Sequence, residues 1–487
     1  MKYSIGSNSS LGSNTPSSTS GSDPFVIGFS DSVNANVSVG DIFTISDDTT
    51  YYGTFIYVLT AISGSSYTLK YISDDGGNGA TSPYGLMEYS GMGPSQSSGS
   101  WTRAFSSIIV FEEMVDNSTP ALFKLTNENV TGLLYSDATF TDTNVNFNNV
   151  QSLGSVTLTV PEAHRHSGVA ASAGTSAVLY KPAAAGGKHD LGAIQLSFTN
   201  AKTPFRAEWL EINMANTSTL NKCFTINTNN SGNPIQINNN LLHSKSGNPG
   251  NTGPYGIWDG RSNLNANRDT VAYYCNNIIY DFVETNNDST QGILAVNAQG
   301  RRSINNNTIY NIKAQGSSKV AIGINYNNDS NGYAVFEIRN NICAKCWGSH
   351  TSNDNYRPFW DRKDDAGAGQ SGIVNASNNL SDDFIQDTIG TTKGGHYQAP
   401  GPNSLVNQSI GDIAFVSVVG GAYNLKITDS SSAAEAGYDL GTTSGVNIDI
   451  GGFDRDGVDV SWDIGAYQVT QTPDSVGGGG FALFIDD

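Results

Sequence analysis

The amino-acid sequence predicts an all-β protein whose main part is a parallel β-helix, a coil in which short strands stack as rungs. Three observations predict this fold. Asparagine pairs recur along the middle of the chain, apolar residues keep fixed offsets from these pairs, and the composition is rich in glycine and poor in charge. Together they indicate a repeat architecture of stacked strands and turns.

The asparagine pairs define the repeat. Each pair is followed by an apolar or β-branched residue, and intervals of 30 to 38 residues separate the second members of successive pairs. These second members are Asn240, Asn277, Asn307, Asn341 and Asn379. Asparagine tolerates a left-handed backbone, and its amide can pair with an asparagine of the next rung. We therefore expect a structural ladder of these five side chains inside the coil.

Apolar residues flank the pairs in columns. Three residues before the second asparagine, the first four repeats carry Ile237, Tyr274, Ile304 and Ile338. Two residues after it, they carry Leu242, Ile279, Ile309 and Cys343. Apolar columns on both sides of a polar hinge are typical of a strand, a tight turn and a second strand. A further apolar segment, such as residues 292–296, separates the pairs, so each turn is expected to hold about three strands.

Composition agrees with this prediction. The chain of 487 residues has 54 glycines and only 14% charged residues, which is typical of short strands and turns, and its 37% hydrophobic residues suffice for a long core. Length alone would suggest about two to four domains. A solenoid grows by adding rungs, so we expect one long β domain with appendages.

The chain is acidic, with a formal net charge of −19 at pH 7. A basic face that could release counterions from phosphates is not expected, which argues against nucleic acid as a partner. The charge also disfavours an anionic membrane surface, and no segment approaches the length of a membrane span. The acidity reflects either a solubility requirement or bound cations, so no cofactor is assigned and calcium stays open.

Four regions follow one another along the chain. Residues 1–24 are expected to form a polar leader, and residues 25–95 a small N-terminal antiparallel β domain, because strand-like segments there alternate with Asp, Gly and Ser turns. The coil, with its cap and its closing segment, takes residues 96–470. Residues 471–487 form a glycine-rich tail with an apolar end, which docks either on a neighbouring subunit or on its own coil.

Residues 105–115 predict a short amphipathic helix. Its apolar positions are Phe105, Ile108, Ile109, Phe111 and Val115. Because an open end of a β-helix exposes strand edges and core, we expect this helix to cap the coil.

The end of the coil carries the most specific motif. Residues 446–455 read VNIDIGGFDR, and residues 462–468 read WDIGAYQ. With the strand-like stretches from residue 415 onward, they resemble the closing segment of right-handed parallel β-helix proteins of the pectin-lyase-like superfamily. Those coils end in D-I-x-G-x-x-R and W/V-D-I-G-A-Y-E, whereas Gln468 stands here where Glu is usual. The resemblance covers about residues 120–470 and implies a right-handed coil.

This resemblance does not name an activity, because the superfamily includes polysaccharide lyases, glycoside hydrolases, phage tailspikes and non-catalytic surface proteins. Residues 3–6 and 107–112 also look like the start of phage or environmental proteins of this type. Residues 1–6 pass into a polar stretch without the apolar run of a secretory signal. We therefore expect a chain made in the host cytoplasm without a signal peptide and located on the virion.

Candidate catalytic residues are few. A lyase of this superfamily would use carboxylate ligands for calcium with a Lys or Arg base, and a hydrolase two carboxyls roughly 5 to 10 Å apart. Asp281 lies in an outward column with Asn311 and Lys345, and Glu284 could lie nearby. The densest charge cluster, in a long insertion beside aromatic residues, contains Asp361, Asp364 and Asp365. This loop could bind sugar rings or a cation, or its opposite charges could pair locally in solvent.

Three motifs suggest metal ligands but favour structural roles. Cys343 and Cys346 fall in apolar columns, so we expect core thiols rather than half a zinc site. His164 and His166 form an H-x-H motif with no third ligand in view. Residues 454–459 resemble a calcium loop but lack its remaining ligand pattern.

Two hypotheses of function follow. The first is a bacteriophage virion structural protein, a β-helix displayed on capsid or tail as decoration, fibre or spike, with an attachment role. Its partners would be other virion proteins and a host surface glycan. The alternative is a polysaccharide-cleaving enzyme, a tailspike-type lyase or hydrolase. A homo-oligomer stays open, because no heptad pattern enforces one.

Overall fold

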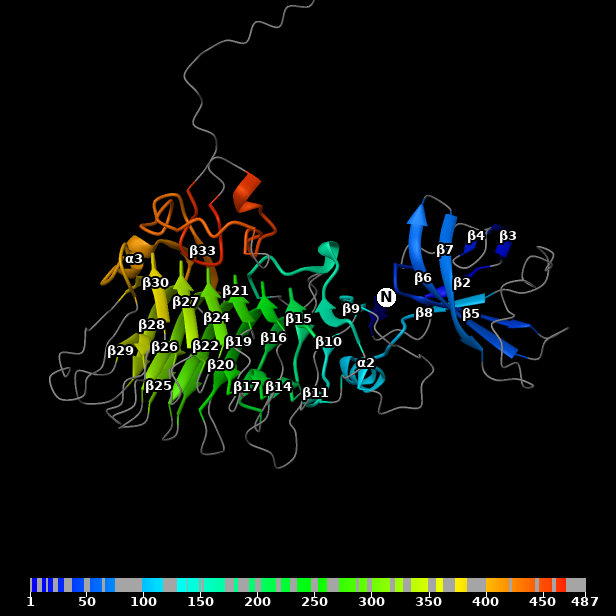
Figure 1. The fold of residues 1–487 in the computed structure, drawn as a ribbon, viewed down its shortest axis with the longest axis horizontal. Coiled ribbons are helices and arrows are strands. Elements are labelled where there is room, and N and C mark those ends of the chain that lie inside the picture. The colour runs from blue at the N-terminus through cyan, green and yellow to red at the C-terminus, as the bar shows by residue number, and fades with distance from the viewer. Residues whose placement is uncertain are drawn as a thin grey trace, which may run out of the picture.

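The computed structural model describes residues 2–6, 11–14, 16–20, 25–29, 37–47, 53–63, 66–74, 99–116, 129–137, 139–148, 150, 153–170, 179–182, 192–197, 203–215, 220–227, 234–246, 253–260, 271–285, 289–295, 300–315, 320–326, 334–348, 356–361, 373–382, 400–419, 423–442, 446–457 and 461–469. Within these residues the chain is a right-handed parallel β-helix with a small antiparallel domain at its N-terminal end (Figure 1). The predicted fold class is confirmed.

The coil has three faces of parallel strands. The first face is a nine-stranded sheet formed, in order, by β1 (Lys2–Ile5), β9 (Asn129–Leu134), β12 (Ser155–Thr159), β15 (Phe205–Glu208), β18 (Ile235–Asn238), β21 (Val271–Cys275), β24 (Gly300–Asn305), β27 (Ala334–Arg339) and β30 (Ile373–Ser377). Its first strand comes from the segment that was expected to be a polar leader. Residues 2–5 are therefore part of the coil.

The second and third faces complete each turn. The second face comprises β10 (Thr139–Phe140), β13 (Leu179–Tyr180), β16 (Glu211–Asn213), β19 (Leu241–Ser246), β22 (Ile278–Glu284), β25 (Thr308–Ala314), β28 (Ile342–Gly348) and β31 (Leu380–Ser381). The third comprises β11 (Val145–Phe147), β14 (Gly192–Leu196), β17 (Lys222–Ile226), β20 (Tyr255–Asp259), β23 (Thr290–Ala295), β26 (Ala321–Tyr326) and β29 (Tyr356–Asp361). An antiparallel contact between β28 and β29 joins these two faces.

The corner between the first and second faces contains the asparagine ladder. The side-chain nitrogen Nδ2 of Asn240 donates to Oδ1 of Asn277 at 3.1 Å, and the same bond recurs from Asn277 to Asn307 at 3.0 Å. It continues to Asn341 at 2.9 Å and to Asn379 at 3.0 Å. Each Oδ1 also accepts a backbone N–H from the preceding rung, as Asn307 does from Asn277. These buried amides satisfy one another, which is the condition for placing polar groups in a core.

The first asparagine of each pair makes the turn. Asn239, Asn276, Asn306, Asn340 and Asn378 all have φ between 53° and 57°. The left-handed region is costly for most residues and tolerated by asparagine. One rung earlier, Trp209 takes the same conformation with φ 66°.

Inside the coil, side chains of successive rungs stack. Ile212, Leu242, Ile279, Ile309 and Cys343 are in register and fully buried. Opposite them on the third face stand Gly256, Gly292 and Gly323. A Cβ added at Gly292 would lie 2.7 Å from the carbonyl oxygen of Gly323 and 2.8 Å from Cγ2 of Ile309. Glycine is thus required where two faces approach closely. Cys343 and Cys346 are buried and free, as expected.

The N-terminal domain is a seven-stranded antiparallel sheet. Its strands, in order, are β2 (Gly12–Asn14), β8 (Gly99–Thr102), β5 (Ile42–Asp47), β6 (Gly53–Ser63), β7 (Ser66–Asp74), β4 (Phe25–Phe29) and β3 (Pro16–Ser20). Strands β2 and β3 also come from the expected leader.

The predicted helix is present as α2 (Ile108–Val115), with Ser107 as its N-cap. It packs against β11 at the end of the coil nearest the N-terminal sheet (Figure 1). Its buried residues include Ile108, Phe111 and Val115, and Phe111 lies against Gly132 of β9. The helix therefore covers the first rung.

The described part of the chain also contains η2 (Glu162–His164), α3 (Ile410–Ile413), β32 (Phe415–Ser417), β33 (Asn424–Ile427) and η5 (Arg455–Gly457). In Figure 1 the last part of the chain, orange to red, lies along one side of the coil. No helix in the described parts of the chain has the length and apolar character needed to span a membrane.

Candidate functional site

The closing segment, residues 415–468, is bound to the coil by the first asparagines of the pairs. Nδ2 of Asn276 donates to the carbonyl of Ile448 at 2.7 Å. Asn340 makes two bonds to Tyr438, donating from Nδ2 to its carbonyl and accepting its N–H at Oδ1, both at 2.7 Å. Asn378 reaches the carbonyl of Ala436 at 3.0 Å. Four of the pairs thus have two functions, because their first members, Asn276, Asn306, Asn340 and Asn378, bind the closing segment and their second members form the ladder.

The closing segment covers an apolar outer surface. The column beside the hinge contains Leu241, Ile278, Ile342 and Leu380, and it faces away from the coil interior. Leu425, Ile450 and Ile464 of the closing segment pack on it. The sequence showed two successive apolar columns on this face, and the structure explains them, because one faces the core and the other faces the closing segment.

The closing motif is a buried polar network. Asp449 accepts backbone N–H groups from Gly451, Phe453 and Gln468 at 2.7–2.9 Å. Arg455 is fully buried and donates to the carbonyl of Gly465 at 2.9 Å and to Oε1 of Gln468 at 3.4 Å. The motif therefore fixes the shape of the closing segment.

Asp281 lies at a bend within the second face. Asp281, Asn311 and Lys345 have φ of 57°, 58° and 54°, and the strand register skips them. Nδ2 of Asn311 donates to Oδ1 of Asp281 and also reaches the hydroxyl of Tyr423 at 3.4 Å. Burial raises the pKa of Asp281, while hydrogen bonds from Asn311 and Tyr423 oppose that shift.

Aromatic rings surround this bend. Tyr280 stacks on His243 with ring centroids 4.9 Å apart, and Tyr423 packs edge-on against Tyr280 at 5.2 Å. Tyr423 also contacts Tyr310 at 5.4 Å. Lys345 is exposed, and its backbone N–H donates to both carboxylate oxygens of Asp382 at 3.0 Å. The bend therefore lies beside two buried tyrosines, Tyr280 and Tyr310, and the half-buried Tyr423.

The other candidate catalytic residues do not join Asp281. Glu284 is fully buried, so its carboxyl has no access to an external glycan. Asp361 ends β29, but its side chain, like the whole of Asp364 and Asp365, lies outside what the structure describes. No group of three His, Cys, Asp or Glu ligands forms among the described residues, which include His164 and His166 but not residues 458 and 459 of the calcium-like motif.

The two histidines of the H-x-H motif serve different contacts. His164 bonds through Nδ1 to the hydroxyl of Ser136 at 2.7 Å and packs edge-on against Tyr135. His166 is buried beside Trp209, with ring centroids 6.2 Å apart. His164 therefore belongs to the junction with the N-terminal sheet and His166 to the side of the coil.

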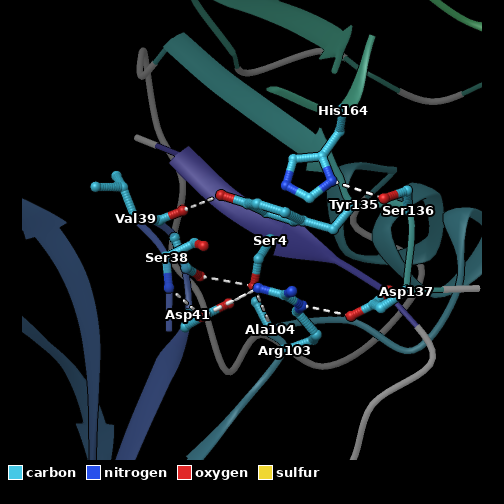
Figure 2. A network of polar contacts seen from close by, with 11 residues as sticks. Ser4, Ser38, Val39, Asp41, Arg103, Ala104, Tyr135, Ser136, Asp137 and His164 are labelled. Atoms are coloured by element: carbon cyan, nitrogen blue, oxygen red, sulfur yellow. Dashed lines mark hydrogen bonds and ion pairs between the residues drawn. The ribbon is translucent and has the colours of Figure 1, made fainter. Parts of the chain in front are cut away.

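The junction between the N-terminal sheet and the coil is a polar network centred on Arg103 (Figure 2). Nη1 of Arg103 donates to both carboxylate oxygens of Asp41, at 2.9 and 3.1 Å, and Nε donates to Asp137 at 2.8 Å. The guanidinium lies 4.0 Å above the ring of Tyr135, whose hydroxyl donates to the carbonyl of Val39 at 3.0 Å. Asp41 belongs to the N-terminal sheet, whereas Tyr135 and Asp137 follow β9 of the coil, so Arg103 joins the two units.

Backbone bonds reinforce this junction. Ser4 of β1 donates its N–H to Gly40 and accepts the N–H of Phe105 at its carbonyl, both at 3.0 Å. Burial raises the pKa of Asp41, and the charge of Arg103 opposes that shift. Sequence reasoning missed this site, because Asp41 and Asp137 lie 62 and 34 positions from Arg103 and carry no periodic pattern.

Comparison of the chain with known protein families, with curated proteins and with solved structures gave no match.

Proposed function

We propose that this protein is a virion structural protein of a bacteriophage, a rigid β-helix displayed on capsid or tail with a role in attachment. The observation that supports it is the junction at Arg103. An ion pair with side chains 5% and 0% exposed, together with a coil strand formed by residues 2–5, joins the N-terminal sheet to the first rung. A displayed rod needs such a base, because a flexible linker would not hold the coil in one direction.

The N-terminal sheet and the coil have separate roles in this proposal. The N-terminal sheet contacts other virion proteins, and the side of the coil contacts a host surface glycan. The long, rigid stack of rungs presents loops at regular intervals, the arrangement that repeat proteins use for extended binding surfaces.

Immunogold electron microscopy tests this proposal. Antibodies against the full chain are applied to particles purified on a density gradient from lysed cells that produce it. We expect label at fixed positions on the particles, with pre-immune serum as the control. Recovery of the chain only in the soluble fraction, with unlabelled particles, would contradict the proposal.

A second candidate function is cleavage of a polysaccharide at Asp281. One observation favours it: burial raises the pKa of this carboxyl, and groups with perturbed pKa values cluster at catalytic sites. The test is release of new reducing ends or unsaturated products from a panel of bacterial surface polysaccharides, with and without calcium. Activity lost in Asp281→Asn but kept in Asp382→Asn would support it, and a panel left intact by the unmodified chain would oppose it.

A further inference from the structure

The short loop 165–170 holds a buried imidazole against the closing segment. His166 is 3% exposed, and its Nδ1 accepts the backbone N–H of Gly168 at 3.2 Å. Because a nitrogen that accepts a hydrogen bond carries no proton, the neutral ring is protonated at Nε2. The bond closes a tight turn over Ser167, with Gly168 at φ +77°.

Tyr467 of the closing segment packs on this turn. The hydroxyl of Tyr467 donates to the carbonyl of Ser167 at 2.5 Å, across 300 residues of sequence. A Cβ at Gly168 would lie 1.7 Å from that hydroxyl oxygen, so the ring of Tyr467 rests directly on the turn. Tyr467 belongs to the closing segment that covers the outer apolar column. The position of His166 and the docking of the closing segment are therefore linked.

Protonation of His166 is incompatible with this turn. A proton on Nδ1 would replace the acceptor by a second donor pointing at the N–H of Gly168. A backbone amide cannot reverse its role, so the turn must open or the imidazolium must move. His164 offers the contrast, since its Nδ1 partner is the hydroxyl of Ser136, which can rotate and accept instead.

The groups around His166 do not remove this conflict. Glu211 on β16 is bonded to His243 on β19, with Oε1 and Nε2 2.9 Å apart. Arg165, on the same loop, lies 4.3 Å over the ring of Trp209, and Lys426 lies 5.1 Å over the ring of Tyr467. Glu211 and backbone hydrogen bonds with Leu210 and Asn239 favour a positive charge on His166, whereas His243 opposes it. Burial is the largest effect and lowers the pKa of His166 to about 4.

We propose that His166 and Gly168 form an acid-sensitive latch, in which protonation of His166 at Nδ1 opens loop 165–170 and releases Tyr467 of the closing segment. The released state exposes part of the apolar column that the closing segment covers. The latch is closed at neutral pH and opens progressively on acidification.

Hydrogen exchange followed by mass spectrometry tests the latch on the full chain between pH 7.5 and 4.5, after correction for intrinsic exchange rates. We expect peptides that contain residues 165–170 and 464–469 to lose protection together, by roughly tenfold per pH unit below pH 6.5. His166→Asn is the informative variant, because its Oδ1 can accept the Gly168 N–H as in an Asx turn and does not titrate. This variant should keep the neutral-pH protection and lose the acid response, while His164→Asn should respond like the unmodified chain.

Two results would overturn the proposal. One is an acid response of the same size in His166→Asn. The other is an NMR titration of the histidine ring signals in which His166 stays neutral at a pH where both peptides have lost protection. The NMR readout stands even if the variant folds poorly, because it uses the unmodified chain. Tyr467→Phe adds a further check, since loss of the bond to Ser167 should lower protection of residues 165–170 already at pH 7.5.

Discussion

Replacement of one asparagine of the ladder should destabilise the coil far more than replacement of its neighbour. Asn307 accepts the backbone N–H of Asn277 at 3.0 Å and donates to the carbonyl of Tyr274 at 2.7 Å, all within the buried corner. Asn307→Ala leaves both partners buried without a hydrogen bond. Each orphaned group costs about 1–3 kcal/mol, so we expect the free energy of unfolding to fall by about 3–5 kcal/mol.

Asn306→Gly is the matched control. Asn306 has φ 56°, which glycine adopts without strain, and its one amide contact to the closing segment is a 3.4 Å bond to Val446. We expect a loss of about 1 kcal/mol. The two substituted positions are adjacent, and both substitutions remove an asparagine amide. The difference between their losses of unfolding free energy therefore measures the contribution of the ladder.

Guanidinium unfolding, followed by both circular dichroism and tryptophan fluorescence, gives the comparison. Coincident transitions are required before a free energy is assigned, because repeat arrays can unfold in steps. Native-state hydrogen exchange of β21 and β24 supplies a local measure. If Asn307→Ala lowers the free energy of unfolding no more than Asn306→Gly does, the ladder does not stabilise the coil.

Three further predictions concern the cap, the core and the junction. Burial and the neighbouring Asp116 raise the pKa of Glu112 to about 9 from 4.5 in the unfolded chain, so the folded state retains a proton and stability falls as pH rises between these values. Glu112→Gln should flatten the decline of Tm between pH 5 and 8. Glu113→Gln removes only the smallest contribution to this pKa shift, so it should flatten the decline less. Gly292→Ala places a methyl 2.7 Å from a backbone oxygen, so it should lower the free energy of unfolding in chemical denaturation by about 1–3 kcal/mol. Gly411→Ala should be tolerated, because its Cβ would have no neighbour closer than 3.5 Å. Arg103→Gln leaves Asp41 buried without its cation and should cost about 3–5 kcal/mol; Arg301→Gln, from an exposed pair with Glu337, should cost under about 1 kcal/mol in the same thermal or chemical unfolding experiments.

The parts of the fold that repeat could be predicted from the sequence. Asn307 recurs with its counterparts at regular intervals, and Ile309 keeps its offset from it, so the pattern identified the coil and its inward column. The helix at Phe111 was equally readable, because its apolar spacing is local. The bonds from the first asparagines to the closing segment could not be predicted from the sequence. Asn276 binds Ile448 across 172 residues, and nothing near either residue indicates the other.

Strand alternation also fails at a specific place. Asp281 was expected on the outside of a regular strand, but a left-handed backbone there bends β22 and turns its side chain toward Asn311 and Tyr423. A period of two residues cannot show such a bend. Asp41 and Arg103 were missed for a related reason, because each is a single charged residue whose partner is defined only when two units of the chain come together.

The closing segment changes how the coil is expected to come apart. In a plain solenoid each rung touches only its neighbours, so rungs at one end can unzip while the rest stay folded. Here Asn276 and Asn378 lie in different rungs and bind one continuous stretch of chain, and Tyr467 ties that stretch to residue 167. Loss of one rung therefore weakens contacts of several others. We expect the rungs from β16 to β30 to exchange their amide hydrogens in a single cooperative event, so that a linear stack behaves as one folding unit.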